Sequence, residues 1–348
     1  MKVCLFIGIL LQITLPPWPF DTDSLEKQIS NLPPGDKIEY YLELADFFSQ
    51  KSFEKSFFYA NNAITLARSS GLYEKEVDAL HVIAICHAGR SRFDKALKYF
   101  QQALAISLEK GYKMGIAKSY NGIGVAYKNT GDLSKALENY MNALRMFEDM
   151  DEKPAISTAL SNIGNIYCRW KKYDSALEYF NRSLQIAEEI NDYGGQSRTL
   201  TNMGLLFCET EQYEDAIKNF KKTLDYAITN DDMAGMARAY QNIGDVYAFW
   251  KNYEMAVDYY LKSLEIEKQI GNNLGIIISL YSIGKMNSEF GYAGEALIYY
   301  NDALELAMET NALNEMKDIC QDMAMIYDSL GNTDKSYEYY RKYVVYKD

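Results

Sequence analysis

The sequence of 348 residues contains few of the residues that break helices or carry out catalysis: six prolines, two histidines and five cysteines. So few prolines leave room for nearly continuous helix, and no long stretch alternates apolar and polar residues as half-buried strands do. The histidines, His81 and His87, lack the i, i+4 spacing of a helical metal pair. No phosphate-binding G-x-x-x-x-G-K-[ST] loop, G-x-S-x-G elbow or kinase loop occurs. The sequence therefore argues against an enzyme and indicates no metal and no cofactor.

Positive charge and long apolar runs are scarce as well. Lysine and arginine total 36 against 48 aspartates and glutamates, which gives a net charge of −12. No basic cluster could follow a phosphate backbone, so we expect no nucleic-acid partner. After residue 20 no segment reaches 18 uncharged apolar residues, so we expect no membrane-spanning helix there.

One apolar stretch stands apart, from Val3 to Leu15, between Met1-Lys2 and a group of prolines. It is too short to span a bilayer and matches the apolar region of a secretory signal peptide. No small-x-small pair precedes Asp21, so an uncleaved anchor or a disordered tail is the alternative. We expect a signal peptide at 1–20, a short helix or linker at 21–35, and a secreted, periplasmic or cell-envelope protein rather than a cytoplasmic one.

The most informative feature present is a glycine that recurs every forty residues: Gly124, Gly164, Gly204, Gly244 and Gly284. Each lies in an apolar run that must be helical, where glycine costs about 1 kcal/mol relative to alanine. Five such glycines at one spacing need a packing reason, and a fixed period of about 20–50 residues indicates a solenoid.

Other positions keep the same register. An aromatic residue follows each of the first four glycines by three positions, as one helical turn requires. An alanine at twelve, an aromatic at sixteen and a small residue at nineteen form one stripe of a second helix. The aromatics at sixteen are Tyr140, Phe180, Phe220, Tyr260 and Tyr300. Glycine- or asparagine-containing breakers separate the repeats, so each unit is predicted to be a helical hairpin of forty residues whose small residues let the helices cross closely.

This pattern resembles the tetratricopeptide repeat family over about residues 36–348, although the usual tryptophan of the first helix is absent and the period exceeds the common 34 residues. The resemblance implies an all-α, right-handed superhelical solenoid of about eight helix-turn-helix hairpins. The approximate repeats are 36–72, 73–112, 113–152, 153–192, 193–232, 233–272, 273–312 and 313–348. Because each repeat of a solenoid contacts only its neighbours, we expect one continuous domain.

The resemblance also implies a binding surface. In this family the first helix of each hairpin forms the concave wall, and its outward residues hold a peptide. Carried over position by position, the wall contains Lys118, Asn121, Asn162, Asn165, Arg169, Arg198, Asn202, Arg238, Gln241 and Asn242. Cations gather here in an acidic chain, so we expect an acidic or carboxylate-bearing segment, and amide side chains can both donate to and accept from a main chain. The alternative for any single position is a solvated polar residue.

The predicted function is therefore a non-catalytic protein–protein interaction module that binds an extended peptide or protein segment. A signal-like segment before such repeats resembles bacterial extracytoplasmic sensor regions, which implies a sensory or scaffolding part of an envelope signalling system. One alternative is a structural scaffold or assembly factor that stacks through its convex face or ends. Another is a fragment of a repeat-containing histidine kinase, cyclase or transcription regulator whose output domain is missing. Membrane contact would involve only the N-terminal segment or missing C-terminal chain.

Three smaller expectations concern single residues. Cys168 and Cys208 share one position in adjacent repeats, where helices about 8–10 Å apart are too distant for a disulfide, so free thiols are predicted. His87 occupies a core tyrosine position and is predicted to be packed. The last helix is rich in tyrosine and valine from Tyr337 to Tyr346, more than its own repeat can cover. We expect an exposed apolar strip there, covered by further chain or by a second copy.

Overall fold

The computed structural model describes residue 29, residues 32–49 and residues 51–347. Over these residues it contains sixteen α-helices and no strand, which confirms the predicted all-α class. The predicted signal peptide at 1–20 lies outside the described residues, as does most of the segment 21–35. The first labelled helix begins at Pro34.

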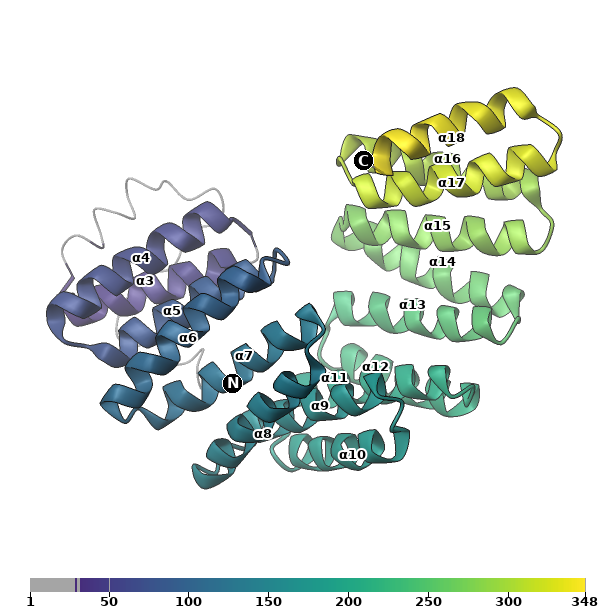
Figure 1. Ribbon diagram of the computed structural model, residues 1–348. Coiled ribbons are helices and arrows are strands. Elements are labelled where there is room, and N and C mark those ends of the chain that lie inside the picture. Colours follow the sequence, from purple (N-terminus) through teal and green to yellow (C-terminus); the bar gives the residue numbers. More distant parts are fainter. Residues whose placement is uncertain (1–28, 30–31, 50, 348) are drawn as a thin grey trace. The chain divides into compact units, whose positions relative to one another are not determined.

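The described part of the chain divides into two compact units, one up to residue 150 and one from residue 151, which we describe separately (Figure 1). The helices of the N-terminal unit are α3 (Pro34–Ser49), α4 (Phe53–Ser70), α5 (Tyr73–Ala88), α6 (Phe93–Lys110), α7 (Lys113–Thr130) and α8 (Leu133–Asp149). Those of the C-terminal unit are α9 (Lys153–Arg169), α10 (Tyr173–Glu189), α11 (Tyr193–Glu209), α12 (Tyr213–Thr229), α13 (Met233–Phe249), α14 (Tyr253–Ile270), α15 (Asn273–Glu289), α16 (Ala293–Glu309), α17 (Leu313–Ser329) and α18 (Thr333–Lys347).

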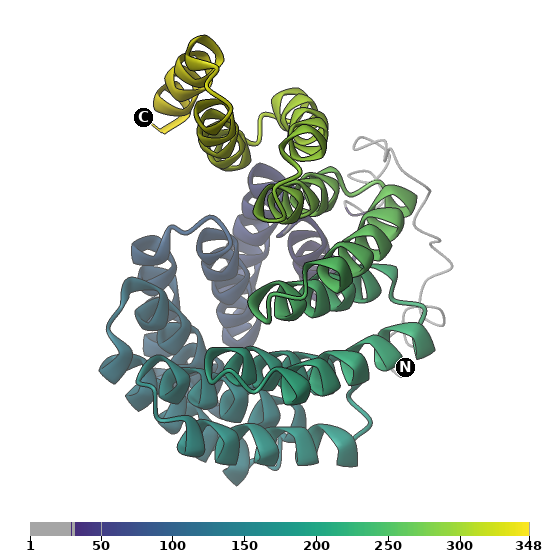
Figure 2. The same ribbon diagram turned by 90° about the vertical axis from the view of Figure 1, so that its right-hand side faces the viewer.

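Within each unit consecutive helices pack side by side as antiparallel hairpins, from α3 with α4 to α17 with α18 (Figure 2). We call the first helix of each hairpin the A helix and the second the B helix. A helices of neighbouring hairpins also contact one another, as α3, α5 and α7 do in the N-terminal unit. The A helices therefore form a continuous layer in the N-terminal unit, and in the C-terminal unit α9 contacts α11 and α15 contacts α17. The A helices of both units carry the predicted wall residues.

The turns repeat with half the period of the hairpins. One residue with φ between 52° and 91° occurs every twenty positions from residue 71 to residue 331. We expected glycine or asparagine in this left-handed conformation, as in Gly131 and Asn191, but the structure also places serine, aspartate, lysine and glutamate there. Since a side chain in this conformation costs about 1–2 kcal/mol, the regular turn is imposed by the packing of its flanking helices.

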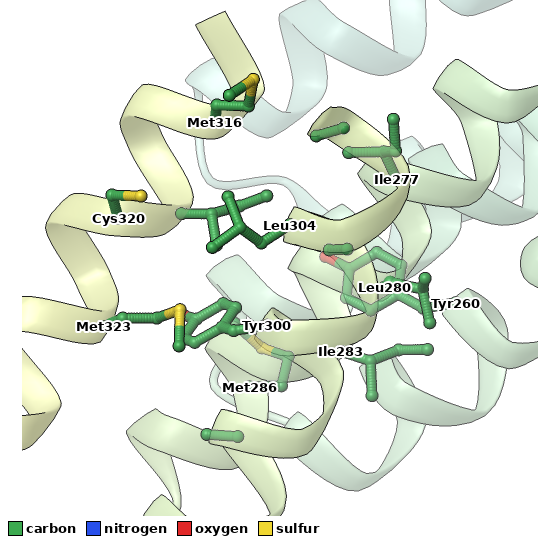
Figure 3. Packing of buried hydrophobic residues seen from close by; sticks show 14 of the residues in the cluster. Tyr260, Ile277, Leu280, Ile283, Met286, Tyr300, Leu304, Met316, Cys320 and Met323 are labelled. Carbon is green, nitrogen blue, oxygen red and sulfur yellow. The ribbon is translucent and has the colours of Figure 1, made fainter. Parts of the chain in front are cut away.

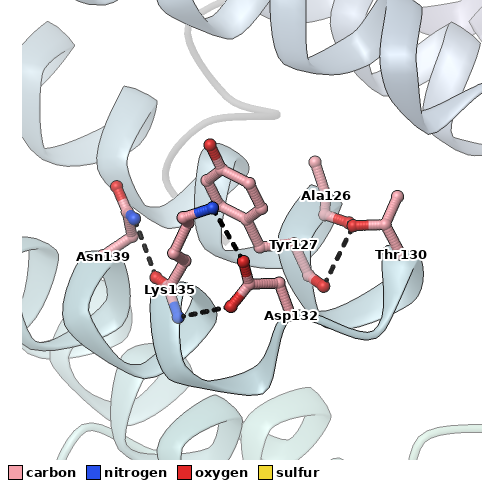
Figure 4. A network of polar contacts seen from close by, with 6 residues as sticks. All are labelled: Ala126, Tyr127, Thr130, Asp132, Lys135 and Asn139. Carbon is pink, nitrogen blue, oxygen red and sulfur yellow. Dashed lines mark hydrogen bonds and ion pairs between the residues drawn. The ribbon is translucent and has the colours of Figure 1, made fainter.

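The turn between α7 and α8 shows how polar side chains complete these connections (Figure 4). The Asp132 carboxylate accepts a hydrogen bond from the backbone N–H of Lys135 at 3.1 Å and caps the start of α8. The ammonium group of Lys135 lies 2.9 Å from the same carboxylate and 5.2 Å from the centre of the Tyr127 ring. On the other side, the Thr130 hydroxyl donates to the Ala126 carbonyl oxygen near the end of α7.

The recurring glycine has the packing reason that its spacing predicted. A Cβ atom on Gly204 would lie 2.7 Å from the Phe220 ring, and one on Gly164 would lie 2.5 Å from the Phe180 ring. The other three glycines of the series meet their own aromatic residue at 2.5–2.7 Å. The aromatic of the B helix therefore lies directly against the backbone of the A helix, and only glycine leaves room for it.

The hairpin of α5 and α6 accommodates its aromatic ring in a different way. Ala84 occupies the glycine position of α5, and the Phe100 ring instead lies against the next A helix, where a Cβ on Gly122 would be 2.3 Å away. The Phe100 ring again requires a glycine beside it, but this glycine, Gly122, belongs to the following hairpin and not to the hairpin of Phe100 itself. The crossing thus has two alternative arrangements. In one, the A helix has alanine and the next A helix has glycine, as in Ala84 and Gly122. In the other, the A helix has glycine and the next A helix has a larger residue, as in Gly204 and Asn242.

The core of the C-terminal unit continues in the same way toward its end. Figure 3 shows the Tyr260 and Tyr300 rings among aliphatic and sulfur-containing side chains from several successive helices. Both tyrosines are at most 2% exposed. This packing holds the A helices in register and so positions the polar residues on their outward faces.

Candidate functional site

The ten predicted wall residues all lie on A helices. Lys118 and Asn121 belong to α7 of the N-terminal unit, and the other eight belong to α9, α11 and α13 of the C-terminal unit. On α7, α9 and α11 they are spaced by three, four or seven residues and therefore share a face, and on α13 Arg238 has this spacing to both Gln241 and Asn242, which are adjacent. The residues of each unit are described separately below.

In the C-terminal unit, four of these residues line one cavity of about 510 Å³. Arg198 and Asn202 reach it from α11, and Arg238 and Asn242 reach it from the equivalent positions of α13. We call this the arginine–asparagine cavity. Asn162, Asn165 and Arg169 on α9 do not line it. The cavity thus repeats one cation and one amide on two successive hairpins, forty residues apart.

The two arginines differ in their surroundings. The Arg238 guanidinium lies 3.8 Å from the carboxylate of Asp232, yet the side chain remains 69% exposed. Arg198 is exposed and has no acidic partner among the residues that the structure describes. Such an exposed pair contributes at most about 1 kcal/mol, so both guanidinium groups are available to an anion.

Aromatic residues complete the cavity, and the sequence reasoning missed them. Tyr193 begins α11 and Tyr226 lies on the B helix α12, with the two ring centres 5.9 Å apart. Neither belongs to the A-helix positions from which the wall was predicted. Tyr226 lies 22 positions after Gly204, outside the A-helix positions that the family resemblance assigns to the concave wall.

Other predicted wall residues are engaged within the protein. The Gln241 amide donates to the Asp245 carboxylate at 3.3 Å and to the Ser282 hydroxyl at 3.1 Å. Asp245 also accepts from the Tyr260 hydroxyl at 2.8 Å. Burial raises the pKa of Asp245, while the hydrogen bonds from Tyr260 and Gln241 lower it. Gln241 therefore belongs to an internal network that orders the wall.

Several polar contacts join residues 40 or 41 positions apart. The Asn202 amide donates to the Ser161 hydroxyl at 3.0 Å, and Gln241 reaches Ser282 in the same manner. In the N-terminal unit, the Lys118 ammonium lies 3.7 Å from the Asp78 carboxylate. Residues 40 or 41 positions apart therefore lie beside one another on neighbouring A helices. Comparing each residue with the one 40 or 41 positions later would have revealed these pairs from the sequence.

Comparison with known proteins agrees with this geometry. A family model described as tetratricopeptide repeat matches five overlapping segments, residues 76–149, 115–189, 155–229, 195–269 and 235–309, and a second model of the same description matches residues 318–344. The chain belongs to the tetratricopeptide repeat family. No curated protein sequence matches it significantly.

Solved structures of similar fold include sensor proteins. The apo form of the quorum sensor NprR from B. thuringiensis has a TM-score of 0.63 and 16% identity, over 94% of this chain and 92% of that one. Aspartyl phosphate phosphatase F from Bacillus subtilis has a TM-score of 0.61 and 16% identity, over 100% and 87% of the two chains. NprR in complex with its cognate peptide NprX has a TM-score of 0.51 and 14% identity, over 88% and 87%. At these identities the likeness shows the tetratricopeptide fold alone.

The thiols and imidazoles of this tetratricopeptide repeat protein are packed. Cys86, Cys168, Cys208 and Cys320 are free, as predicted, and burial raises the pKa of Cys168 and Cys208 to about 11. His87 stacks on the Tyr99 ring at 5.5 Å, so the predicted packed histidine is confirmed. Among the described residues no cluster of three or more histidine, cysteine or acidic side chains could hold a metal ion. In that same part of the chain, every helix is too short or too polar to cross a bilayer.

The last tetratricopeptide helix, α18, has the apolar strip that its sequence predicted. Tyr339, Tyr343 and Tyr346 pack against the core, whereas Tyr337 is 64% and Val345 is 71% exposed. No residue of α18 is buried. Coverage of this strip by further chain or by a second copy stays a prediction.

Proposed function

We propose that this protein is a non-catalytic interaction module whose C-terminal unit binds an extended peptide through the arginine–asparagine cavity. Arg198 and Arg238 would hold an acidic side chain or a terminal carboxylate, and Asn202 and Asn242 would hold the peptide main chain. The observation that carries the proposal is the cavity itself, which repeats a guanidinium and an amide on two successive A helices. NprR, whose fold is similar, has been solved with a peptide, which supports the class of ligand.

The chemistry of the cavity favours a carboxylate. Guanidinium groups form paired hydrogen bonds with carboxylates, and each charge-assisted bond contributes about 1.5–3 kcal/mol. Amide side chains can satisfy both the N–H and the C=O of an extended strand. Tyr193 and Tyr226 add apolar surface on which an aliphatic part of the ligand can pack.

Fluorescence anisotropy with two labelled peptides tests the proposal. One is a short glutamate-rich peptide, and the other has glutamine in place of every glutamate. We expect the acidic peptide to bind more tightly, and the variant Arg198→Glu/Arg238→Glu to lose at least about tenfold in affinity, because two charged contacts become repulsive.

The matched control is Lys222→Glu/Lys268→Glu, which makes the same change of charge at exposed positions of α12 and α14 that do not line the cavity. This control should bind as the wild type does. Equal loss in both variants would show that general electrostatics and not the cavity attracts the peptide. Full binding by the arginine variant would overturn the proposal.

The proposal extends to a sensory or scaffolding role in a bacterial cell envelope, which rests on the apolar stretch at 3–15. Cell fractionation with mass measurement of the mature N-terminus tests it, and an intact Met1 in the cytoplasmic fraction would contradict it. The scaffold alternative is favoured by the exposed strip on α18. Light scattering tests that alternative, since a monomer at micromolar concentration shows that a second copy does not cover the strip.

A further inference from the structure

The A helices of the N-terminal unit enclose a second groove of a different kind. It has a volume of about 1060 Å³ and is lined mainly by α3, α5 and α7, which contact one another in that order. Its floor is apolar: Leu42, Val82, Ile85 and Val125 come from the three helices. Ile85 is 46% exposed, so its side chain can contact a bound ligand.

The rim of this groove is acidic. Glu39, Glu43 and Asp46 follow one another on α3 at the spacing of one helix face, and Asp78 adds a fourth carboxylate from α5. We call this surface the acidic groove. Two lysines also line it: Lys75 forms an ion pair with Glu39, and Lys118 lies 3.7 Å from Asp78. Glu43 and Asp46 have no cationic partner among the described residues, so the groove has more negative than positive charge.

The carboxylates of the acidic groove are not fully compensated by the neighbouring cations. Burial and the neighbouring Glu39 raise the pKa of Glu43, and burial raises the pKa of Asp78 even though Lys118 and Lys75 lower it. His81 also lines the groove, is 6% exposed, and has an Nδ1 atom without a hydrogen-bond partner. A cation bound in the groove would stabilise the charged form of both carboxylates.

We propose that the acidic groove binds a peptide segment in which lysine or arginine side chains alternate with aliphatic ones. The cationic groups would pair with Glu43 and Asp46, and the aliphatic groups would cover Ile85 and the floor around it. This inference rests on the proposed function in treating the A-helix layer as a peptide-binding surface. It concerns another unit and the opposite charge, so either proposal can fail without the other.

The size of the groove sets the length of the segment. Packed helices lie about 8–10 Å apart, so three A helices extend over roughly 20 Å, and an extended chain covers about 3.3–3.6 Å per residue. A segment of about six residues therefore crosses the groove. This length holds two or three cations and as many aliphatic residues.

The test uses the full chain and a labelled probe peptide, Gly-Lys-Leu-Ala-Lys-Val-Ala-Lys-Gly, with a second peptide in which glutamate replaces lysine. Anisotropy should show binding of the lysine peptide only. The variant Glu43→Gln/Asp46→Asn removes the two unpaired carboxylates without touching the core, and we expect at least about tenfold weaker binding. Ile85→Ser should weaken this probe but leave unchanged any binding of a peptide with glycine in place of leucine, valine and alanine.

A control is essential because any cation is attracted to a chain of net charge −12. Glu138→Gln/Asp94→Asn makes the same change of charge at exposed positions of α8 and α6 outside the groove, and it should bind the probe as the wild type does. Circular dichroism verifies that each variant is folded.

Three results would overturn the inference. They are equal loss in the groove variant and the control, full binding by Glu43→Gln/Asp46→Asn, and competition by spermidine as strong as that by unlabelled probe. The last would identify the ligand as a small polycation and not a peptide. Loss of acidic-peptide binding in the arginine variant leaves the lysine probe unaffected, so the two cavities are distinguished in one set of measurements.

Discussion

A single methyl group added at Gly204 tests why the glycine recurs. Its Cβ would lie 2.7, 2.8 and 3.0 Å from three atoms of the Phe220 ring. Overpacking of this kind costs about 1–3 kcal/mol, whereas replacing a mid-helix glycine by alanine gains about 1 kcal/mol in helix propensity. We therefore expect Gly204→Ala to be less stable than the wild type by up to about 2 kcal/mol. Gly204→Leu should cost more, about 3 kcal/mol, because the ring itself must leave the crossing.

The matched control is Gly294→Ala on α16, where a Cβ meets no atom within 4 Å and the backbone is helical. This change should leave stability unchanged or raise it by up to about 1 kcal/mol. Urea unfolding followed by circular dichroism compares the variants, and hydrogen exchange of α11 and α12 locates the effect, since repeat proteins do not always unfold in one step.

A compensating change makes the test sharper. In the hairpin that has Ala84, the Phe100 ring occupies the space left by Gly122 in the next A helix. The equivalent residue for Phe220 is Asn242, so Gly204→Ala/Asn242→Gly should recover most of the stability that Gly204→Ala loses. If Gly204→Ala is as stable as Gly294→Ala, or the second change brings no recovery, our account of the crossing is refuted.

Two further predictions concern the turns and a buried imidazole. Lys171 has a φ of 58°, so Lys171→Gly should raise the free energy of unfolding by about 0.5–1 kcal/mol in urea titrations. Gly131 has a φ of 91°, so Gly131→Ala should lower the free energy of unfolding. Equal effects of the two changes would contradict the backbone strain at these turns. Burial and the nearby Lys118 charge lower the pKa of His81 from 6.5 to about 3. Between these two pH values the unfolded chain binds a proton on His81 that the folded chain does not. The free energy of unfolding therefore decreases as the pH falls through this range. From pH 7 to pH 5 the wild type should lose about 2 kcal/mol more than His81→Met, and parallel pH profiles would show that His81 is not the group responsible.

The sequence by itself determined the helical hairpins, their forty-residue period and the existence of a packing reason for the recurring glycine. Gly204 and Phe220 lie sixteen residues apart within one hairpin, and this spacing repeats five times, but only the packed helices show that the ring lies against the glycine. The surplus of apolar residues on α18 was equally readable, because the number of residues that one helix face can bury is limited.

The tertiary structure decided which wall residues face a cavity and which charges remain uncompensated. Lys118 looks like a free cation in the sequence but lies beside Asp78, and Gln241 is held by Ser282 of the next hairpin. These contacts join neighbouring hairpins through side-chain directions that the apolar period does not encode. The same holds for the aliphatic floor and unpaired carboxylates of the acidic groove, because they become one surface only when three A helices pack in register.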